Sequence, residues 1–373
     1  MKSDRALKSW IENDLQTKMV FLGGPRQVGK TTLAKSFTEK KEQYLNWDFP
    51  DDRALIRQHR LNPELKLIVL DEVHKFAKWR SLVKGFYDKY GDTLSILVTG
   101  SARLDHFRKG GDSLQGRYHY YRLHPFSLAE ADKKYKRQTV LDLMKFGGFP
   151  EPFLSRDERT YRRWSRERIA KVIYEDLRDL ENVKELSLLE LLVDALPSKV
   201  GSLLSVNSLR EDLEVSPNTV ASWIEILERL YYCYRISPMG APKIRTVKKA
   251  GKLYLWDWAE VENQGARFEN LVAGQLLKYC HFLEDTEGYR MDLRFLRDTE
   301  GREIDFVVFR NKKALFAVEC RTGEKHISPH IRYFRSRTDI PFFYQIHLGK
   351  DDWQEENIRV LPFETFCRAE KMP

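Results

Sequence analysis

The sequence predicts an α/β protein whose N-terminal part is built around a parallel sheet. Three apolar runs carry this prediction: Met19-Val-Phe-Leu22, Leu67-Ile-Val-Leu70, and the run TLSILVTGSAR at residues 93–103. A continuous apolar run is typical of a central parallel strand, because both of its faces are buried. Glycine, hydroxyl or carboxyl residues follow each run. The carboxyl ends of such strands are where open α/β sheets bind their ligands.

The composition agrees with ordinary globular domains. The chain has 373 residues, enough for two or three domains, and 42% of them are hydrophobic. Lys and Arg total 64 against 55 Asp and Glu, and the net charge of +9 fits an anionic partner without requiring one. Four widely spaced cysteines predict free thiols and not a disulfide frame or a zinc site. No apolar run approaches the ~20 residues of a membrane span, and the N-terminus is charged, so we expect a cytoplasmic protein with no membrane attachment.

The first strand leads into the glycine-rich turn GGPRQVGKTTL at residues 23–33. Between a strand and a helix, the spacing G-x-x-x-x-G-K-[ST] forms a loop whose backbone N–H groups surround a phosphate. Lys30 would reach the β- and γ-phosphates, and the Thr31 hydroxyl would hold Mg²⁺. A chance glycine turn is the alternative, but the flanking strand and helix favour nucleotide binding. The residues expected at the phosphates are Gly24, Pro25, Arg26, Gln27, Val28, Gly29, Lys30, Thr31 and Thr32.

The second strand ends in two adjacent carboxylates, Asp71 and Glu72. We expect Asp71 to organise the Mg²⁺ shell together with Thr31, and Glu72 to activate the attacking water. An apolar strand that ends in Asp-Glu is common by itself. Its position downstream of a phosphate loop is what gives the pattern its specificity.

Two further residues are candidates for acting on the γ-phosphate. Ser101 follows the third strand and would sense the phosphate or hold the water; an ordinary Gly-Ser turn is the alternative. Arg117 lies in the segment SLQGRYHYYRLHPFSLAE. Its guanidinium would neutralise transition-state charge in the site of a neighbouring subunit, which implies a homo-oligomer. A surface arginine is the competing interpretation.

Together the segments GPRQVGKTTL, LDEVHK, VTGSAR, LQGRY, HPFSLAE and GGFPEPF resemble a widespread bacterial and archaeal family of AAA-type P-loop ATPases. The resemblance covers most of the chain and follows the site residues above motif by motif. It implies an AAA-type P-loop ATPase domain at residues 1–150, a helical linker and winged-helix domain at 151–262, and a C-terminal domain at 263–373. That last domain is of unknown function and related in fold to restriction endonucleases. His74 departs from the family, which commonly has glutamine there.

The middle segment has helix-turn-helix spacing at residues 206–232. Ser216 is a suitable N-cap and Pro217 a suitable first helical residue for the second helix. Strands around residues 232–236 and 253–256 would form a wing with a basic tip, which suits DNA phosphates with little sequence specificity. A plain protein-interaction module is the alternative. The basic residues expected to contact DNA are Lys243, Arg245, Lys248, Lys249 and Lys252.

The C-terminal segment carries a carboxylate pattern on two predicted strands, GREIDFVVF at 301–309 and ALFAVECR at 314–321, after a helix that contains Glu269. Asp305 and Glu319 match the D…(D/E)xK arrangement of restriction-endonuclease-like folds and are candidate Mg²⁺ ligands. Arg321 stands where that arrangement has lysine, and arginine cannot act as a general base. A polar network without a metal is therefore the alternative, and nuclease activity is doubtful.

These observations predict an ATP-binding, Mg²⁺-dependent ATPase of the AAA type that couples turnover to the binding of nucleic acid or a partner. Two alternatives remain: a slowly hydrolysing, nucleotide-gated protein-interaction switch, and an ATP-regulated nuclease. The expected cofactors are ATP and Mg²⁺. The sequence names neither the pathway nor the target.

Overall fold

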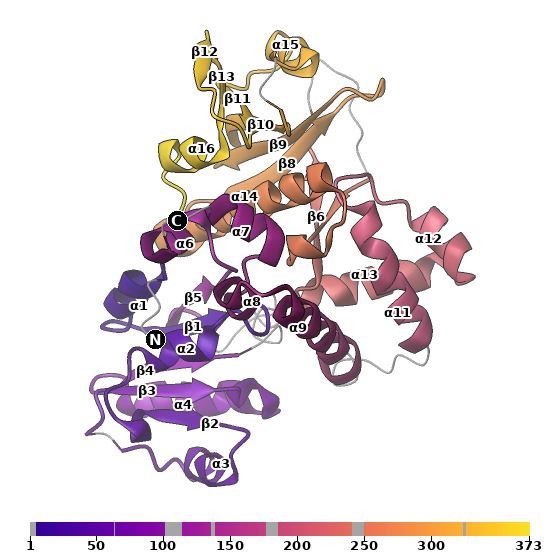
Figure 1. The fold of residues 1–373 in the computed structure, drawn as a ribbon. Coiled ribbons are helices and arrows are strands. Elements are labelled where there is room, and N and C mark those ends of the chain that lie inside the picture. Colours follow the sequence, from indigo (N-terminus) through magenta and orange to yellow (C-terminus); the bar gives the residue numbers. More distant parts are fainter. Residues whose placement is uncertain are drawn as a thin grey trace. The chain divides into compact units, whose positions relative to one another are not determined.

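The computed structural model describes residues 5–62, 64–100, 114–135, 139–176, 186–240, 250–323 and 326–373. The chain divides into two compact units, unit 1 at residues 1–124 and unit 2 at residues 125–373. Figure 1 colours both along the sequence. The division into three domains at residues 150 and 262 stays a prediction.

Unit 1 is built on a five-stranded sheet with the strand order β2-β3-β4-β1-β5. All four neighbouring pairs are parallel. The central strands β3, β4 and β1 are the three apolar runs, and almost every residue in them is buried. This confirms the predicted parallel α/β fold. The strands are β1 Met19–Gly23, β2 Tyr44–Asn46, β3 Leu67–Asp71, β4 Ser95–Thr99 and β5 Tyr118–Arg122.

The helices of unit 1 alternate with its strands (Figure 1). Helix α4 shows how they pack: Trp79, Leu82, Val83 and Phe86 recur at helical spacing and are buried in the same core as Phe21 of β1. The helices are α1 Lys8–Asp14, α2 Lys30–Lys35, α3 Pro50–Arg57 and α4 Trp79–Tyr90, with 3₁₀ turns η1 Lys41–Gln43 and η2 Val73–Lys75.

Unit 2 contains an eight-stranded mixed sheet with the order β12-β13-β11-β10-β9-β8-β6-β7. The two strands that sequence predicted as a wing are β6 and β7. They pair antiparallel with each other, and Ser237 and Pro238 of β6 also pair parallel with β8. The wing strands are therefore the edge of the C-terminal sheet. The strands are β6 Cys233–Pro238, β7 Lys252–Leu255, β8 Met291–Arg297, β9 Glu303–Arg310, β10 Lys313–Cys320, β11 Phe343–His347, β12 Trp353–Glu355 and β13 Ile358–Pro362.

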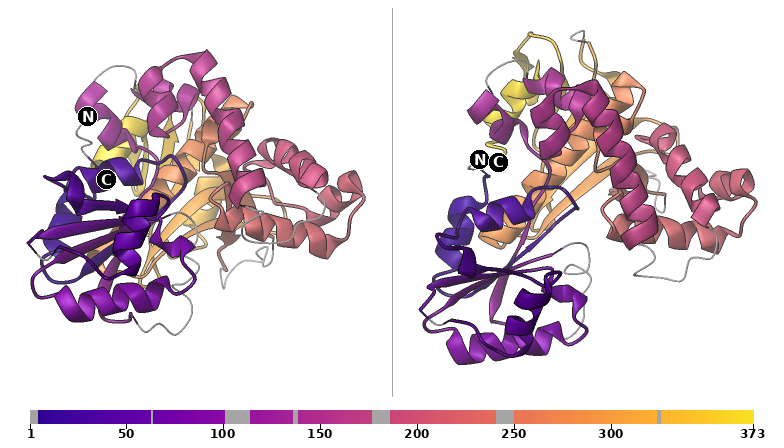
Figure 2. Two further views of the ribbon diagram at one scale, coloured as in Figure 1. Left: turned by 90° about the horizontal axis from the view of Figure 1, so that it is seen from below. Right: turned by 60° about the horizontal axis from the view of Figure 1, so that its bottom comes forward.

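The predicted helix pair of the middle segment is present as α12 and α13. The Ser216 side chain accepts a hydrogen bond from the Thr219 backbone N–H, and Pro217 is the first helical residue, as expected. Both views in Figure 2 show the helices between residues 186 and 229 grouped to one side of the unit 2 sheet. The α-helices of unit 2 are α6 Leu128–Tyr135, α7 Thr139–Phe146, α8 Pro150–Ser155, α9 Glu158–Lys171, α11 Leu186–Ala195, α12 Val206–Leu213, α13 Pro217–Arg229, α14 Gln264–Glu287, α15 Pro329–Arg335 and α16 Phe363–Ala369. The short helices are η4 Val172–Asp176, η5 Leu196–Lys199 and η6 Trp258–Glu260.

Helix α14 lies along the unit 2 sheet and contacts β7, β8, β9 and β10 (Figure 2). It buries Phe268, Leu271, Val272 and Leu276, and this fixes Glu269, near its start, beside the strands. Although α14 has 24 residues, no helix in the described ranges is long and apolar enough to cross a membrane.

Candidate functional site

The phosphate loop connects the end of β1 to the start of α2 at Lys30. Two positions of the loop require glycine, because their positive φ angles are rarely adopted by other residues. Gly24 has φ +139°, and Gly29, the N-cap of α2, has φ +97°. A Cβ on Gly24 would lie 2.4 Å from the Leu123 carbonyl oxygen, so a larger residue would push the loop away from β5. Pro25 has no backbone N–H, so it cannot donate one to a phosphate. The Val28 side chain is fully buried, so Val28 can contribute only through its main-chain atoms.

The Lys30 side chain is folded into the loop and is only 8% exposed. Its Nζ donates to the carbonyl oxygens of Gly24 at 2.9 Å and Pro25 at 2.7 Å. The ammonium is therefore held at the centre of the turn by neutral acceptors. Phosphate oxygens are stronger acceptors, because a hydrogen bond between two charged groups is roughly twice as strong as a neutral one.

Asp71, the last residue of β3, collects three hydroxyl donors. Its Oδ2 accepts from Thr31 Oγ1 at 2.9 Å and from Tyr44 at 2.5 Å, and its Oδ1 accepts from Thr99 Oγ1. Burial, with a further contribution from Asp71, raises the pKa of the Tyr44 phenol above its ordinary value, so Tyr44 remains a donor. The predicted pair of Thr31 and Asp71 is thus brought together at the carboxyl edge of the sheet.

The oxygen atoms around Thr31 fit Mg²⁺. A hydroxyl and a carboxylate are hard oxygen ligands, and Mg²⁺ is usually bound through one or two carboxylates plus substrate phosphates and water. The described residues contain no group of three or more His, Cys, Asp or Glu that could hold a metal by themselves. A cation at Thr31 and Asp71 would therefore depend on the phosphates of a nucleotide.

Glu72 follows directly in a left-handed conformation, with φ 58° and ψ 16°. A non-glycine residue rarely adopts this conformation, which costs on the order of 1–3 kcal/mol and is concentrated at functional sites. Burial first, and the neighbouring Asp71 charge second, raise the pKa of the Glu72 carboxyl. Nε2 of the buried His74 lies 3.7 Å from Glu72 Oε2, as does Nζ of Lys75. His74, the departure from the family pattern, therefore faces the predicted base.

The two γ-phosphate candidates have different outcomes. Ser101 lies outside the described residues, and Thr99, two positions earlier, contacts Asp71. Arg117 is described, but it precedes β5, where its carbonyl accepts from the N–H of Met19 at the amino end of β1. The phosphate loop leaves the opposite end of that strand. Arg117 Nε donates to Asp88 at 2.9 Å, so within one chain it does not join the site.

Most of the proposed DNA contacts lie beyond the part of the chain that the structure describes: Lys243, Arg245, Lys248 and Lys249. Lys252 is described, and its assignment to DNA is wrong. Its side chain is 1% exposed, in β7, and it forms ion pairs inside unit 2. All four residues of β7 are buried, so this strand offers no exposed face for a phosphate.

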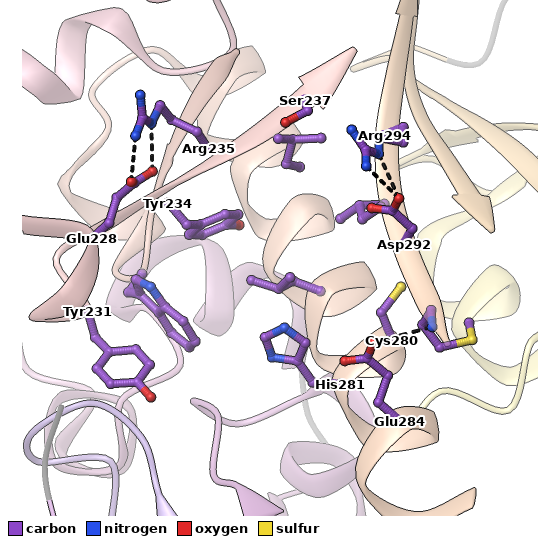
Figure 3. A pocket seen from close by; sticks show the side chains of 15 residues that line it. Glu228, Tyr231, Tyr234, Arg235, Ser237, Cys280, His281, Glu284, Asp292 and Arg294 are labelled. Carbon is purple, nitrogen blue, oxygen red and sulfur yellow. Dashed lines mark hydrogen bonds and ion pairs between the residues drawn. The ribbon is translucent and has the colours of Figure 1, made fainter. Parts of the chain in front are cut away.

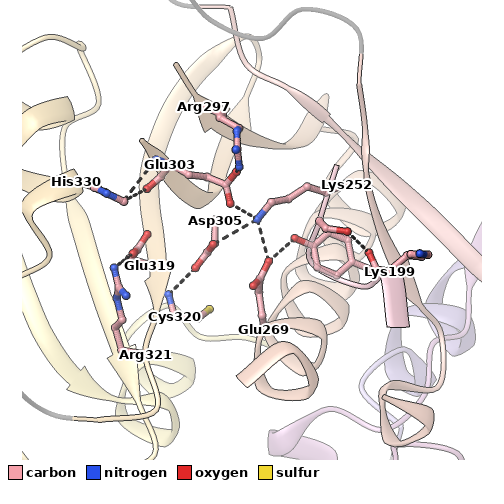
Figure 4. A network of polar contacts seen from close by, with 12 residues as sticks. Lys199, Lys252, Glu269, Arg297, Glu303, Asp305, Glu319, Cys320, Arg321 and His330 are labelled. Atoms are coloured by element: carbon pink, nitrogen blue, oxygen red, sulfur yellow. Dashed lines mark hydrogen bonds and ion pairs between the residues drawn. The ribbon is translucent and has the colours of Figure 1, made fainter. Parts of the chain in front are cut away.

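Figure 4 shows the carboxylates of the C-terminal sheet around that lysine. Lys252 Nζ lies 3.0 Å from Glu269, 3.4 Å from Asp305, and in contact with Glu303. Asp305 also accepts from the Cys320 backbone N–H at 2.9 Å. Glu319, on the next strand, accepts from Arg321 at 2.6 Å.

The predicted Mg²⁺ role of Asp305 and Glu319 does not fit this arrangement. Asp305 lies 3.4 Å from the Lys252 ammonium and accepts from the Cys320 N–H, and one oxygen of Glu319 pairs with Arg321. Arg321 does not serve a water molecule either, because its guanidinium is paired with Glu319 and donates to Ser328. The alternative reading, a polar network, describes these residues better.

Burial is the largest cause of the raised pKa values of Glu269 and Glu319 in this network. Burial, followed by the charge of Asp305, raises the pKa of Glu269 to about 7. The same two causes raise the pKa of Glu319. Burial alone would lower the pKa of Lys252, but Asp305, Glu269 and Glu303 together raise it above its ordinary value, so Lys252 stays charged.

A separate cavity of about 390 Å³ lies between α13, β6, α14 and β8 (Figure 3). Two Arg–carboxylate pairs line it, Arg235 with Glu228 and Arg294 with Asp292. Tyr234 also lines it. None of the residues that sequence singled out as functional belongs to this cavity.

Sequence reasoning missed Tyr44, and it missed Lys252 as a partner of carboxylates. At the polar end of the third strand it chose Ser101, and not Thr99, as the site residue. Thr99 ends a predicted strand, so its position beside Asp71 on the neighbouring parallel strand could have been inferred. Tyr44 lies on the short edge strand β2, which has no apolar run to reveal it. The pairing of Lys252 depends on β7 joining the C-terminal sheet, for which no local sequence signal exists.

Residues 16–131 match the model of an AAA domain. Residues 137–260 match a domain of unknown function (DUF8612), and residues 264–366 match another (DUF4143). Uncharacterized protein MJ1544 of Methanocaldococcus jannaschii is 24% identical over 305 residues, which are 70% of this chain and 68% of that protein. Uncharacterized protein Rv2008c of Mycobacterium tuberculosis is 22% identical over 245 residues, 64% of this chain, and the match spans only 54% of its length.

Two solved structures are similar at low scores. The Aeropyrum pernix ORC1 protein, solved in complex with DNA, has a TM-score of 0.36 and 13% identity, over 73% of this chain and 93% of that chain. A STAND protein with a tetratricopeptide repeat sensor from Pyrococcus horikoshii has a TM-score of 0.31 and 14% identity, over 76% of this chain and 48% of that chain. These scores are too low to carry an argument about function. The phosphate loop, the parallel sheet and the domain match together show that the N-terminal part of the chain is a P-loop domain of the AAA type.

Proposed function

We propose that unit 1 binds ATP with Mg²⁺ and hydrolyses it. The observation that carries this proposal is the hydrogen bond of 2.9 Å between Thr31 and Asp71. It joins the residue after the loop lysine to the strand-end carboxylate, at the edge of the sheet where α/β proteins bind ligands. A glycine turn without a nucleotide role would not need this pairing.

Each residue has a distinct task in the proposed reaction. Lys30 and the loop N–H groups bind and orient the phosphates, and the Lys30 ammonium exchanges its carbonyl acceptors for phosphate oxygens. Thr31 and Asp71 would hold Mg²⁺, which supplies charge neutralisation when bound. Glu72 takes a proton from the attacking water, and its raised pKa makes it a better base than an ordinary carboxylate.

The test of nucleotide binding is Lys30→Ala. Because the Lys30 ammonium donates to the loop carbonyls of Gly24 and Pro25, at the centre of the turn, ATP affinity or turnover should collapse in this variant. Lys18→Ala is the matched control, since Lys18 precedes the opposite end of β1. Calorimetric titration with ATP measures both. Equal affinity and turnover in wild type and Lys30→Ala would dismiss the proposal.

We also propose that unit 2 couples this activity to nucleic acid, through the segment that joins β6 to β7. The capped helix pair α12 and α13 and four basic residues of the segment support this: Lys243, Arg245, Lys248 and Lys249. The half-buried Arg117, now paired with Asp88, would be presented to the ATP site of a second copy, which would make the active form an oligomer.

Replacing Lys243, Lys248 and Lys249 with alanine tests the coupling to DNA. DNA affinity should fall, and its log–log salt dependence should become shallower by about 0.9 for each lost phosphate contact. Lys252 is left intact because it is buried, so its loss would disturb the fold. Fluorescence anisotropy at several salt concentrations gives the slope. An unchanged affinity and slope would leave protein partners as the explanation for the helix pair.

A further inference from the structure

The carboxylates of the C-terminal sheet enclose a cation that belongs to the chain itself. Lys252 is in β7, whereas its three partners come from α14 and β9 (Figure 4). An ammonium has three N–H donors. With Glu269, Glu303 and Asp305 each within ion-pair distance of Nζ, every donor has a carboxylate to bind.

A fourth carboxyl makes this cluster more than a set of surface ion pairs. Glu319 is 4% exposed, and its Oε2 has no hydrogen-bond partner among the described residues. Glu319 lies on β10, which pairs with β9, the strand that carries Glu303 and Asp305. A buried carboxylate oxygen without a donor is costly, and it is the type of ligand that a hard divalent cation prefers.

Three side chains supply positive charge at the cluster. Arg297 pairs with Glu303 at 2.9 Å, and Arg321 pairs with Glu319 at 2.6 Å. With Lys252 these give three cations to four carboxyls, so one carboxyl remains without a full counter-charge. The raised pKa of Glu269 and of Glu319 reduces that excess by favouring their neutral forms.

The surroundings leave the ammonium little room to move aside. Tyr254 donates to Glu269 Oε1 at 2.8 Å. On the other side, a Cβ on Gly201 would lie 3.1 Å from the Glu269 carboxylate, so backbone closes the cluster there. Because Lys252 is 1% exposed, a metal ion could enter only by displacing it.

We propose that the Lys252 ammonium substitutes for a divalent cation in the C-terminal sheet, and that its removal opens a site for a hard divalent cation such as Mn²⁺. The wild-type sheet then needs no metal. It also follows that wild-type unit 2 does not catalyse metal-dependent phosphodiester cleavage, since the carboxylates that would hold the metal hold lysine.

The experiment compares Lys252→Met with Lys278→Met in the full chain, without nucleotide. Lys278 is also buried, and it pairs with the carboxylate of Glu130. Lys252→Met should bind Mn²⁺ at least about tenfold more tightly than wild type, measured by calorimetry, and millimolar Mn²⁺ should raise its melting temperature. Lys278→Met should show neither effect. The ATP site is the same in every variant and cancels in the comparison.

Two outcomes would overturn the proposal. One is a folded Lys252→Met that binds Mn²⁺ no better than wild type. The other is a wild-type Mn²⁺ site that Asp305→Asn and Glu319→Gln each abolish, because the metal would then displace the lysine. The second comparison uses no lysine variant, so it decides the question even if Lys252→Met does not fold: equal Mn²⁺ binding by wild type, Asp305→Asn and Glu319→Gln supports the proposal.

Discussion

Asp71 and Asp305 are both strand carboxylates in a position to bind a cation, but their partners differ. Asp71 accepts hydrogen bonds from the neutral hydroxyls of Thr31, Tyr44 and Thr99. Asp305 shares a buried ammonium with two glutamates. Neutral donors orient a carboxylate and leave its negative charge in place. An ammonium also orients the carboxylate, but it neutralises the charge as well.

The comparison shows why a sequence motif for a metal site is insufficient evidence of a metal. What decides is whether a side-chain cation of the protein already pairs with the carboxylates. At the ATP site the loop cation, Lys30, is held by carbonyl oxygens of Gly24 and Pro25. In the C-terminal sheet the cation from β7 is held by the carboxylates themselves, so an ammonium already lies among the groups that would attract a metal.

The largest expected effect separates chemistry from binding at the first site. Glu72→Gln keeps the size of the side chain but removes its ability to accept a proton. We expect ATP turnover to fall by on the order of a hundredfold or more, the scale of a lost general base, while ATP still binds. A steady-state phosphate-release assay and calorimetric titration measure the two quantities. Normal turnover would mean that another residue activates the water.

The next largest effect is on the free energy of unfolding, which we compare for one variant at each of the two sites. In EDTA, Lys252→Met should lower the free energy of unfolding by about 3–5 kcal/mol, because the remaining buried carboxylates lose their shared counter-ion. Asp71→Asn should cost only about 1 kcal/mol, because amide oxygen still accepts from hydroxyls, yet it should impair Mg²⁺-dependent turnover.

Urea denaturation can assign both losses to a unit. ATP should shift the transition of unit 1, since a ligand stabilises only what it binds. The Lys252→Met loss should occur in the transition that ATP does not shift. Equal losses for the two variants would remove the distinction between neutral and cationic partners.

Local sequence was sufficient to predict that Thr31 and Asp71 meet, because both residues lie at the ends of predictable elements. The apolar runs fixed β1, β3 and β4, and parallel pairing then brought Thr31 to Asp71 without any long-range guess. The same reasoning found the helix pair, since the cap at Ser216 and the apolar spacing of α13 are local signals.

The C-terminal site could not be predicted in this way. Sequence located Asp305 and Glu319 on their strands and noted that arginine replaced the expected lysine. The lysine that actually contacts Asp305 comes from a strand 53 positions earlier in the chain. Its contact depends on the pairing of β6 with β8, which only two residues of β6 make. A short tertiary contact of this type leaves no periodicity in the sequence.

The smallest effect tests how charged the C-terminal cluster is. Because the pKa of Glu269 is raised from 4.5 to about 7, the folded state keeps a proton that the unfolded state releases between these pH values. The unfolding free energy should therefore fall as pH rises from about 4.5 to about 7, by at most about 1.4 kcal/mol per pH unit from this group, and then level off. Glu269→Gln is neutral at every pH and lacks this contribution. Subtracting its stability from that of wild type, by urea denaturation across this range, isolates Glu269. A difference that stays level from about pH 5.5 upward would instead mean that Glu269 is ionised in the folded state as well, and that its pairing with Lys252 outweighs burial.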